Sequence, residues 1–195
     1  MRLPICAFIL LTACAGALAN PITIQVLPAS QNVNVGDPVT LTLQISGLGT
    51  GTAPSVGTFD IDVAFDPTLL SLTNTAFGTS LDIFGLGDIQ IATPGTSTVN
   101  LFELSLDSDS DLNSLQPASF VLATLSFTAL GNGISPVSLS VNALGDADGN
   151  SLSTILQDGS VTVGPSASTP EPATIFTLGG ALAALGIYRR YRRAA

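Results

Sequence analysis

The sequence of 195 residues contains no histidine and no lysine, and its two cysteines, Cys6 and Cys14, both lie near the N-terminus. Without histidine the chain cannot build a His-based triad, a histidine general base or a His-containing zinc site. Because cysteine is confined to that end, everything after Cys14 lacks disulfides, thiol nucleophiles and cysteine-bound metals. These absences exclude most of the common catalytic centres from the body of the chain.

Positive charge is almost as scarce, since the only basic residues are five arginines at the two ends, Arg2, Arg189, Arg190, Arg192 and Arg193. All 14 acidic residues lie between Arg2 and Arg189, and 13 of them fall between Asp37 and Asp158. A segment without Lys or Arg has nothing to neutralise phosphates, so we expect no nucleic-acid binding and no Walker-type phosphate loop. Without its ends the protein would carry a net charge near −13, which repels anionic polymers and attracts divalent cations.

The N-terminus has the three parts of a secretory signal peptide. Arg2 precedes an apolar run over residues 3–11, and the small residues Ala17 and Ala19 stand three and one before a cleavage point. This pattern predicts a signal peptide over residues 1–19, with Asn20 as the first mature residue. The run is too short for a membrane span. An alternative is that residues 11–14 form a lipobox, with Cys14 lipidated and retained; both interpretations predict export.

The C-terminus has the plan of a stop-transfer tail. The segment Pro170-Glu171-Pro172 precedes an uncharged stretch over residues 173–188, which predicts a short transmembrane helix. The four terminal arginines, Arg189, Arg190, Arg192 and Arg193, are expected to stay in the cytoplasm. The two prolines hold the segment before the helix extended and accessible to a processing enzyme. Residues 165–169 are expected to form a spacer to this tail.

This three-part tail, over residues 170–193, resembles the PEP-CTERM sorting signal of Gram-negative bacteria. The family commonly has valine before the first proline, where this chain has Thr169. The resemblance implies recognition by an exosortase, an integral membrane cysteine transpeptidase, followed by removal of the tail. It also implies an inner-membrane-anchored precursor that reaches the cell surface or matrix, often alongside exopolysaccharide. An ordinary C-terminal anchor that is never cut is the alternative.

The body, residues 20–164, alternates apolar and polar side chains with a period of two. In one segment Val39, Leu41, Leu43 and Ile45 alternate with polar residues. Turn-forming residues separate such segments, and no amphipathic helix of useful length is present; one helical turn is expected at residues 111–116. The pattern predicts an all-β sandwich or jelly roll of about nine strands. These strands are expected over residues 22–27, 39–45, 59–65, 69–73, 89–92, 98–104, 120–129, 136–141 and 160–163.

The order of several motifs in the body resembles a cohesin-like module, a nine-stranded jelly roll related to carbohydrate-binding sandwiches. The motifs that carry the likeness lie at residues 35–40, 45–48, 57–67, 122–127 and 158–163. The resemblance implies the fold and a non-enzymatic binding or scaffolding role. Partner identity does not transfer with it, because cohesin surfaces vary.

Two acidic segments are candidate calcium sites. Asp107, Asp109, Asp111 and Asn113 stand at alternate positions, and in an extended loop their oxygen atoms would point the same way, which suits Ca²⁺. The glycine and glutamate positions of an EF-hand are absent, and a solvated polar loop is the alternative. The second segment has Asp146, Asp148 and Asn150, for which a tight turn is the favoured interpretation. We predict no other cofactor.

Asp60 and Asp62 lie on the polar face of one predicted strand, about 7 Å apart, a separation that fits a glycosidase pair. However, tryptophan is absent, and both tyrosines, Tyr188 and Tyr191, lie in the tail, so the body offers neither of these rings as a sugar platform. We favour the interpretation that these outward charges discourage edge pairing, and we predict no catalytic residue.

The sequence therefore predicts an exported, non-enzymatic surface or matrix protein that an exosortase sorts. Its β-sandwich is expected to bind a polysaccharide or protein partner in association with exopolysaccharide or biofilm. A carbohydrate-binding or scaffolding module in polysaccharide breakdown is the alternative.

Overall fold

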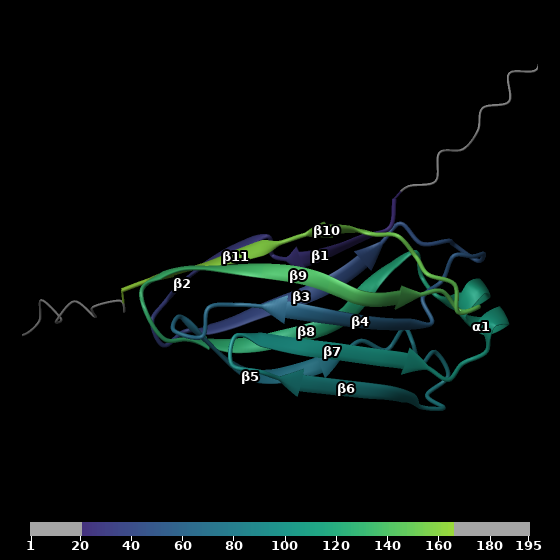
Figure 1. The fold of residues 1–195 in the computed structure, drawn as a ribbon, viewed down its shortest axis with the longest axis horizontal. Coiled ribbons are helices and arrows are strands. Elements are labelled where there is room, and N and C mark those ends of the chain that lie inside the picture. The colour runs from purple at the N-terminus through teal and green to yellow at the C-terminus, as the bar shows by residue number, and fades with distance from the viewer. Residues whose placement is uncertain (1–20, 166–195) are drawn as a thin grey trace, which may run out of the picture.

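The computed structural model describes residues 21–165, which fold into two β-sheets packed face to face (Figure 1). One sheet has five strands in the order β10-β1-β3-β8-β5, and the other has six in the order β2-β11-β9-β4-β7-β6. The predicted all-β sandwich is confirmed. The elements are β1 (Thr23–Leu27), β2 (Ser30–Asn34), β3 (Pro38–Ser46), β4 (Thr58–Ala64), β5 (Leu70–Phe77), β6 (Asp88–Pro94), β7 (Thr98–Ser105), α1 (Asp109–Leu115), β8 (Ser119–Ala129), β9 (Gly133–Gly145), β10 (Ile155–Gln157) and β11 (Gly159–Gly164).

All nine predicted strands are present, and the structure adds two short ones, β2 and β10. Strand β2 pairs in parallel with β11, and β10 pairs in parallel with β1. Strands β1 and β2 form one chain segment that passes from one sheet to the other, and β10 and β11 form a second. Because β2 is mostly polar and β10 has only three residues, neither shows a readable alternation. One side of the sandwich is thus bridged by these crossing segments, while β5 and β6 are the free edge strands of the other side.

The core lies between the sheets and is built from the inward positions of the alternating strands. On β4, for example, Phe59, Ile61 and Val63 are completely buried, whereas the residues between them are partly exposed. Phe65 and Phe127 meet edge to face, with their ring centroids 5.0 Å apart. The period-two pattern therefore decides which residues of each strand remain for the outer faces.

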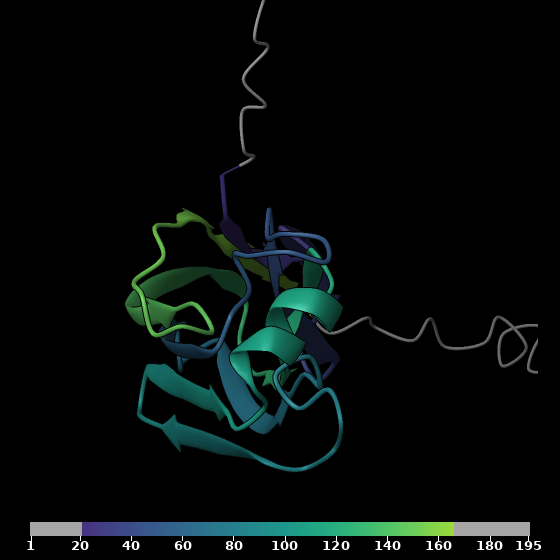
Figure 2. The same cartoon turned by 90° about the vertical axis from the view of Figure 1, so that its right-hand side faces the viewer.

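One end of the sandwich is closed by α1 and the loops around it (Figure 2). Ser108 caps this helix by accepting a hydrogen bond from the Asp111 N–H at 3.2 Å. The buried Gln116 ties the end together: its Oε1 accepts from the Val56 N–H at 2.6 Å, and its Nε2 donates to the Val56 and Ser80 carbonyls, both at 3.0 Å. Every polar atom of this buried amide has a partner, so it fixes the loops before β4 and after β5.

Within residues 21–165 no helix is long and apolar enough to cross a membrane. The predicted signal peptide, with Ala17, Ala19 and Asn20, lies outside the described residues. So do the predicted helix over residues 173–188, the Pro170-Glu171-Pro172 segment and the terminal arginines.

Candidate functional site

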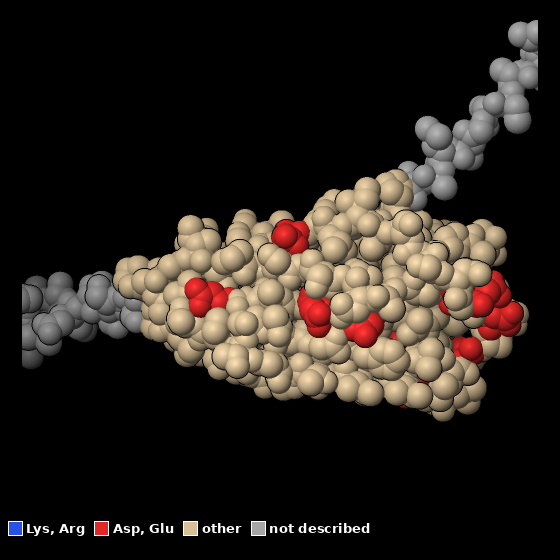
Figure 3. Space-filling model, viewed as in Figure 1, with Lys and Arg blue, Asp and Glu red and all other residues tan. Residues whose placement is uncertain are grey.

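The outer face of the six-stranded sheet carries the carboxylate pair that the sequence singled out. Asp60 and Asp62 point away from the core on β4, and Figure 3 shows acidic atoms in the middle of this face and at the end beside α1. Strand β4 pairs with β7 on one side and β9 on the other, so it is central. The interpretation that these charges protect a sheet edge is therefore wrong, because β4 is not an edge strand.

Two asparagines from the flanking strands hold both carboxylates. Asn100 on β7 donates to Asp60 at 2.6 Å and to Asp62 at 2.9 Å. Asn142 on β9 donates to the same two groups, at 3.1 Å and 3.0 Å. The Asn142 and Asn100 amides hold the pKa of the Asp62 carboxyl below its usual range, because they stabilise its charged form. A β-bulge between Asp60 and Ile61 brings Asn142 within reach of both carboxylates.

Apolar side chains lie beside this carboxylate pair on the same face. Ile91 stands opposite Phe102 in the β6–β7 register, and Ile89 stands opposite Leu104. Phe102 is in turn opposite Asp60, so a row of side chains runs from the edge strand to the centre of the sheet. Ile89 and Ile91 are 43% and 49% exposed. We call the outward set the mixed face; its members are Asp60, Asp62, Asn100, Asn142, Ile89, Ile91, Phe102 and Leu104.

The mixed face offers carboxyl hydrogen-bond acceptors next to apolar surface. A retaining or inverting glycosidase needs one carboxyl with a raised pKa as its acid, whereas the pKa of Asp62 is lowered. Exposed apolar side chains grouped around an aromatic ring form a surface that the apolar core of a protein–protein contact can cover. The arrangement therefore suits contact with another protein better than acid catalysis.

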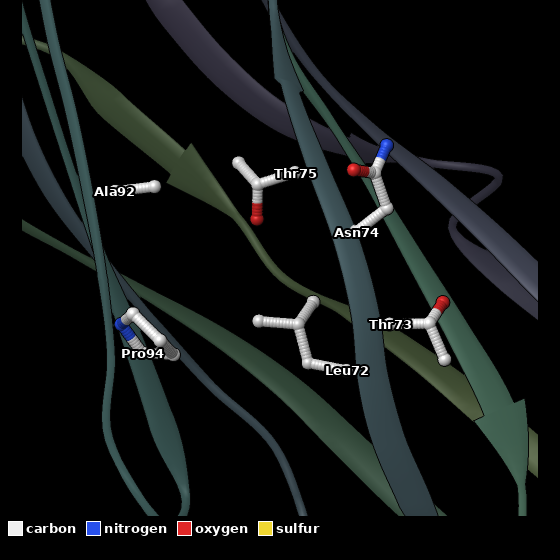
Figure 4. A pocket seen from close by; sticks show the side chains of 6 residues that line it. All are labelled: Leu72, Thr73, Asn74, Thr75, Ala92 and Pro94. Atoms are coloured by element: carbon white, nitrogen blue, oxygen red, sulfur yellow. The ribbon is translucent and has the colours of Figure 1, made fainter.

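A hollow lies between the two free edge strands, β5 and β6 (Figure 4). It has a volume of about 320 Å³. Leu72 and Thr75 of β5 point across it toward Ala92 and Pro94 of β6. Its six lining residues, which also include Thr73 and Asn74, are all uncharged and none is aromatic. The cleft therefore suits a neutral ligand without ring stacking.

The first predicted calcium segment is largely helical rather than extended. Asp109 and Asp111 lie in α1, where Asp111 accepts a hydrogen bond from the Ser108 hydroxyl at 2.7 Å. Asp107 accepts from the Ile83 N–H at 2.7 Å, and Asn113 accepts from the Ser55 hydroxyl at 2.8 Å. Because consecutive helical residues point in different directions, the alternate spacing does not converge as expected.

The second predicted segment forms a turn, in which Asp146 accepts from the Asn150 N–H at 2.7 Å and from its side-chain amide at 3.1 Å. Gly149 has a φ of +84°, and Asp148 is exposed. No group of three or more His, Cys, Asp or Glu residues within 21–165 is arranged to hold a metal ion. Calcium binding stays a prediction, which melting temperatures in excess Ca²⁺ and in chelator would test.

Sequence reasoning missed three polar residues that the structure makes important: Asn100, Asn142 and Glu103. The two asparagines are scattered in the sequence, and only strand pairing brings them to Asp60 and Asp62. Glu103 did leave a signal, because it shares the apolar parity of Val99 and Leu101 and is therefore an acid on the buried side of β7.

Two family models match the chain. The cohesin domain model covers residues 24–163, and the PEP-CTERM protein-sorting motif covers residues 168–193. The chain belongs to the cohesin family. Both resemblances seen in the sequence are thereby confirmed, and the sorting motif is that of an exported precursor anchored in the membrane. A search of curated proteins gave no match.

Solved cohesin structures share this fold at low sequence identity. The non-cellulosomal cohesin of the archaeon Archaeoglobus fulgidus is 14% identical with a TM-score of 0.59, over 76% of this chain and 94% of that one. The Coh-OlpA–Doc918 cohesin–dockerin complex of Clostridium thermocellum gives 16% and 0.60, over 74% and 99%. CaCohA2 of Clostridium acetobutylicum gives 20% and 0.57, over 75% and 94%. At these identities the likeness establishes the fold of this cohesin domain.

Proposed function

We propose that the mixed face of this cohesin domain binds a dockerin-type protein, and that the protein is a non-enzymatic binding module outside the cell. The observation that carries the proposal is the placement of exposed Ile89 and Ile91 beside a carboxylate pair that two asparagine amides hold. Support also comes from similar structures, since the Coh-OlpA–Doc918 structure is that of a cohesin–dockerin complex.

The chemistry of the mixed face defines what the partner must offer. Its apolar residues need an apolar surface to cover them, and its carboxylates accept hydrogen bonds from basic or amide donors. With 13 acidic residues between Asp37 and Asp158 and no basic residue among them, the domain attracts a positively charged partner over a distance. Association is therefore expected to slow as salt is added.

The tail supports a proposed route to the outside. An exosortase would recognise Pro170-Glu171-Pro172 and the following helix, remove the tail, and leave the cohesin domain at the surface or in an exopolysaccharide matrix. Mass spectrometry of the tagged chain tests this step in hosts with and without an active exosortase. Loss of the tail only in the first host supports the route, and an intact tail in both contradicts it.

The docking proposal is tested with a matched pair of substitutions on opposite sheets. Ile91→Asp places a charge in the mixed face, whereas Val121→Asp changes an exposed residue of β8 in the other sheet. A dockerin-type partner is first isolated from the producing bacterium, purified and titrated against the full chain in detergent. Ile91→Asp is expected to weaken binding at least about tenfold, with little effect of Val121→Asp. Equal binding by both variants contradicts the mixed face as the site.

A neutral glycan is the second candidate ligand, because the cleft between β5 and β6 has hydroxyl and amide groups and no charge. A glycan array probed with the full chain separates the two proposals. Saturable sugar binding that Thr75→Ala abolishes and Ile91→Asp leaves intact favours the glycan. Turnover of any glycan that vanishes in Asp60→Asn or Asp62→Asn would instead establish an enzyme.

A further inference from the structure

Glu103 is the one acidic side chain among residues 21–165 that lies in the interior. It is 1% exposed and stands opposite Phe59 of β4 in the β4–β7 register, on the core side of the sheet. A charged carboxylate in such a place loses its hydration and needs a compensating partner. The surroundings of Glu103 therefore decide whether it carries a charge or a proton.

The groups around Glu103 offer no positive charge. Gln90 on β6 donates from its Nε2 to Glu103 Oε1 at 3.1 Å and to Asp88 at 2.8 Å, so one amide bridges the two acids. Asp88 lies within hydrogen-bonding reach of Glu103, and Asp82 adds a second negative charge nearby. The body of the chain contains no Lys, Arg or His that could pair with them.

The second carboxylate oxygen shows how this cluster is completed. Glu103 Oε2 is buried and receives no hydrogen bond from any donor. Protonation neutralises the carboxyl, so that no charged oxygen is left without a donor, and it lets the acid donate to the neighbouring Asp88 carboxylate. In agreement, burial first and the hydrogen bond with Asp88 second raise the pKa of Glu103 from an ordinary 4.5 to about 8.

We propose that a proton held between Glu103 and Asp88 fastens the edge strand β6 and the preceding loop to the sandwich, and that its loss above neutral pH loosens them. The inference rests on the proposed function in one respect, since β6 carries the Ile89 and Ile91 of the mixed face. The protein is thereby a docking module in which the strand that carries Ile89 and Ile91 is held most firmly while this proton is present.

The position of β6 explains why one proton matters. The strand is at the edge and pairs only with β7, and nearly all of its residues are exposed. Asp88 is its first residue, and Asp82 holds the loop before it by accepting from the Gly87 N–H at 3.0 Å. Ionised Glu103 would repel both, and the ladder with β7 would remain as the main attachment of the strand.

Hydrogen–deuterium exchange of the full chain in mild detergent tests the role of the proton between Glu103 and Asp88 without any partner. Glu103→Gln keeps the shape of the protonated acid, and comparing it with the parent at equal pH cancels the intrinsic pH effect on exchange. Peptides over residues 78–93 are expected to exchange alike at pH 6, and about tenfold faster in the parent than in Glu103→Gln at pH 9. Equal exchange at both pH values overturns the proposal.

A second measurement keeps the test decisive if Glu103→Gln folds poorly. Carbon NMR of the side-chain carboxyls in the parent chain should show Glu103 titrating near pH 8. A midpoint near 4.5 overturns the proposal that Glu103 holds a proton. Asp148→Asn, which removes an exposed acid elsewhere, should change neither readout. A dockerin-type partner that binds at pH 6 and weakens at pH 9 supports both ideas. If exchange is faster at pH 9 but no partner binds the mixed face, the proposal for the Glu103 proton is supported and the docking proposal is contradicted.

Discussion

Two groups of acids on neighbouring strands of one sheet have opposite environments. Asp60 and Asp62 of β4 face outward and accept four hydrogen bonds from Asn100 and Asn142. Glu103 of β7 faces inward, where the bridging amide of Gln90 is its only side-chain donor and two further acids lie nearby. The same functional group therefore has a lowered pKa at Asp62 and a raised pKa at Glu103.

The difference shows how a domain without basic residues satisfies its carboxylates. Where amides can be placed on both sides, as at the centre of the outer face, their hydrogen bonds favour the charged form of Asp62. Where burial removes water and the neighbours are acids, a proton takes the place that Lys or Arg fills in other proteins.

The largest expected effect comes from removing the inward acid. Because the native chain keeps a proton on Glu103 at pH values where the unfolded chain has released it, the contribution of this group to stability is complete below pH 4.5 and is lost as pH rises to about 8. We expect the free energy of unfolding to drop by about 3 kcal/mol between pH 5 and 8, and Glu103→Gln to abolish most of this drop. Chemical denaturation at each pH measures it.

The control for this pH profile is the chain's own composition, since it has no histidine, the side chain that ordinarily titrates in that interval. A flat profile in the parent chain would mean that Glu103 is charged throughout and that the contrast with the outward pair does not exist.

The next largest effect is expected from replacing one of the two amide donors of Asp60 and Asp62 with an acid. Asn100→Asp replaces the amide that donates to both Asp60 and Asp62 with a third acid. We expect a loss of about 2 kcal/mol at pH 7, and a smaller loss at pH 3, where carboxyls become protonated. Asn132→Asp, in the exposed β8–β9 turn, is the matched control. An equal loss in both variants would show that added negative charge, and not the lost donor, is responsible.

The sandwich could be predicted from the sequence because alternation is a local signal. The inward residues of β3 and β4 follow one another at every second position, and turn residues mark the ends of the strands. Strands β2 and β10 were not predicted, because β2 is mostly polar and β10 has only three residues. The helix α1 begins before the single turn that was expected, because Ser108 supplies a cap.

The mixed face could be predicted only in part. Asp60 and Asp62 share a face by spacing alone, but their place at the centre of the sheet depends on the pairing order of distant strands. Asn142 reaches them because of a bulge that no sequence pattern announces. The role proposed for β6 likewise depends on its place at the edge of the sheet, which the pairing order of distant strands decides.

A smaller effect should follow from separating burial and neighbouring charge at Glu103. Asp88→Asn removes the closest acid and keeps an oxygen that can accept from Gln90. Since burial remains, we expect the pKa of Glu103 to stay above its ordinary value and the titration to move to lower pH. The variant should be more stable than the parent by about 1 kcal/mol at pH 9, measured by denaturation, with Asp148→Asn unchanged. A less stable variant would show that Asp88 supports β6 through contacts unrelated to the proton.

The smallest effect is expected at Asp82, which acts on Glu103 only through its charge. Asp82→Asn keeps an oxygen to accept from the Gly87 N–H, so the loop before β6 should stay in place. Because solvent screens this more distant interaction, we expect a gain of only a few tenths of a kcal/mol at pH 9. Carbon NMR of the Glu103 carboxyl in Asp88→Asn and in Asp82→Asn shows which substitution shifts its titration midpoint more. A larger change in the titration midpoint of Glu103 for Asp82→Asn than for Asp88→Asn would place the proton between Glu103 and the loop before β6. The proton would then fasten the loop and not the edge strand directly.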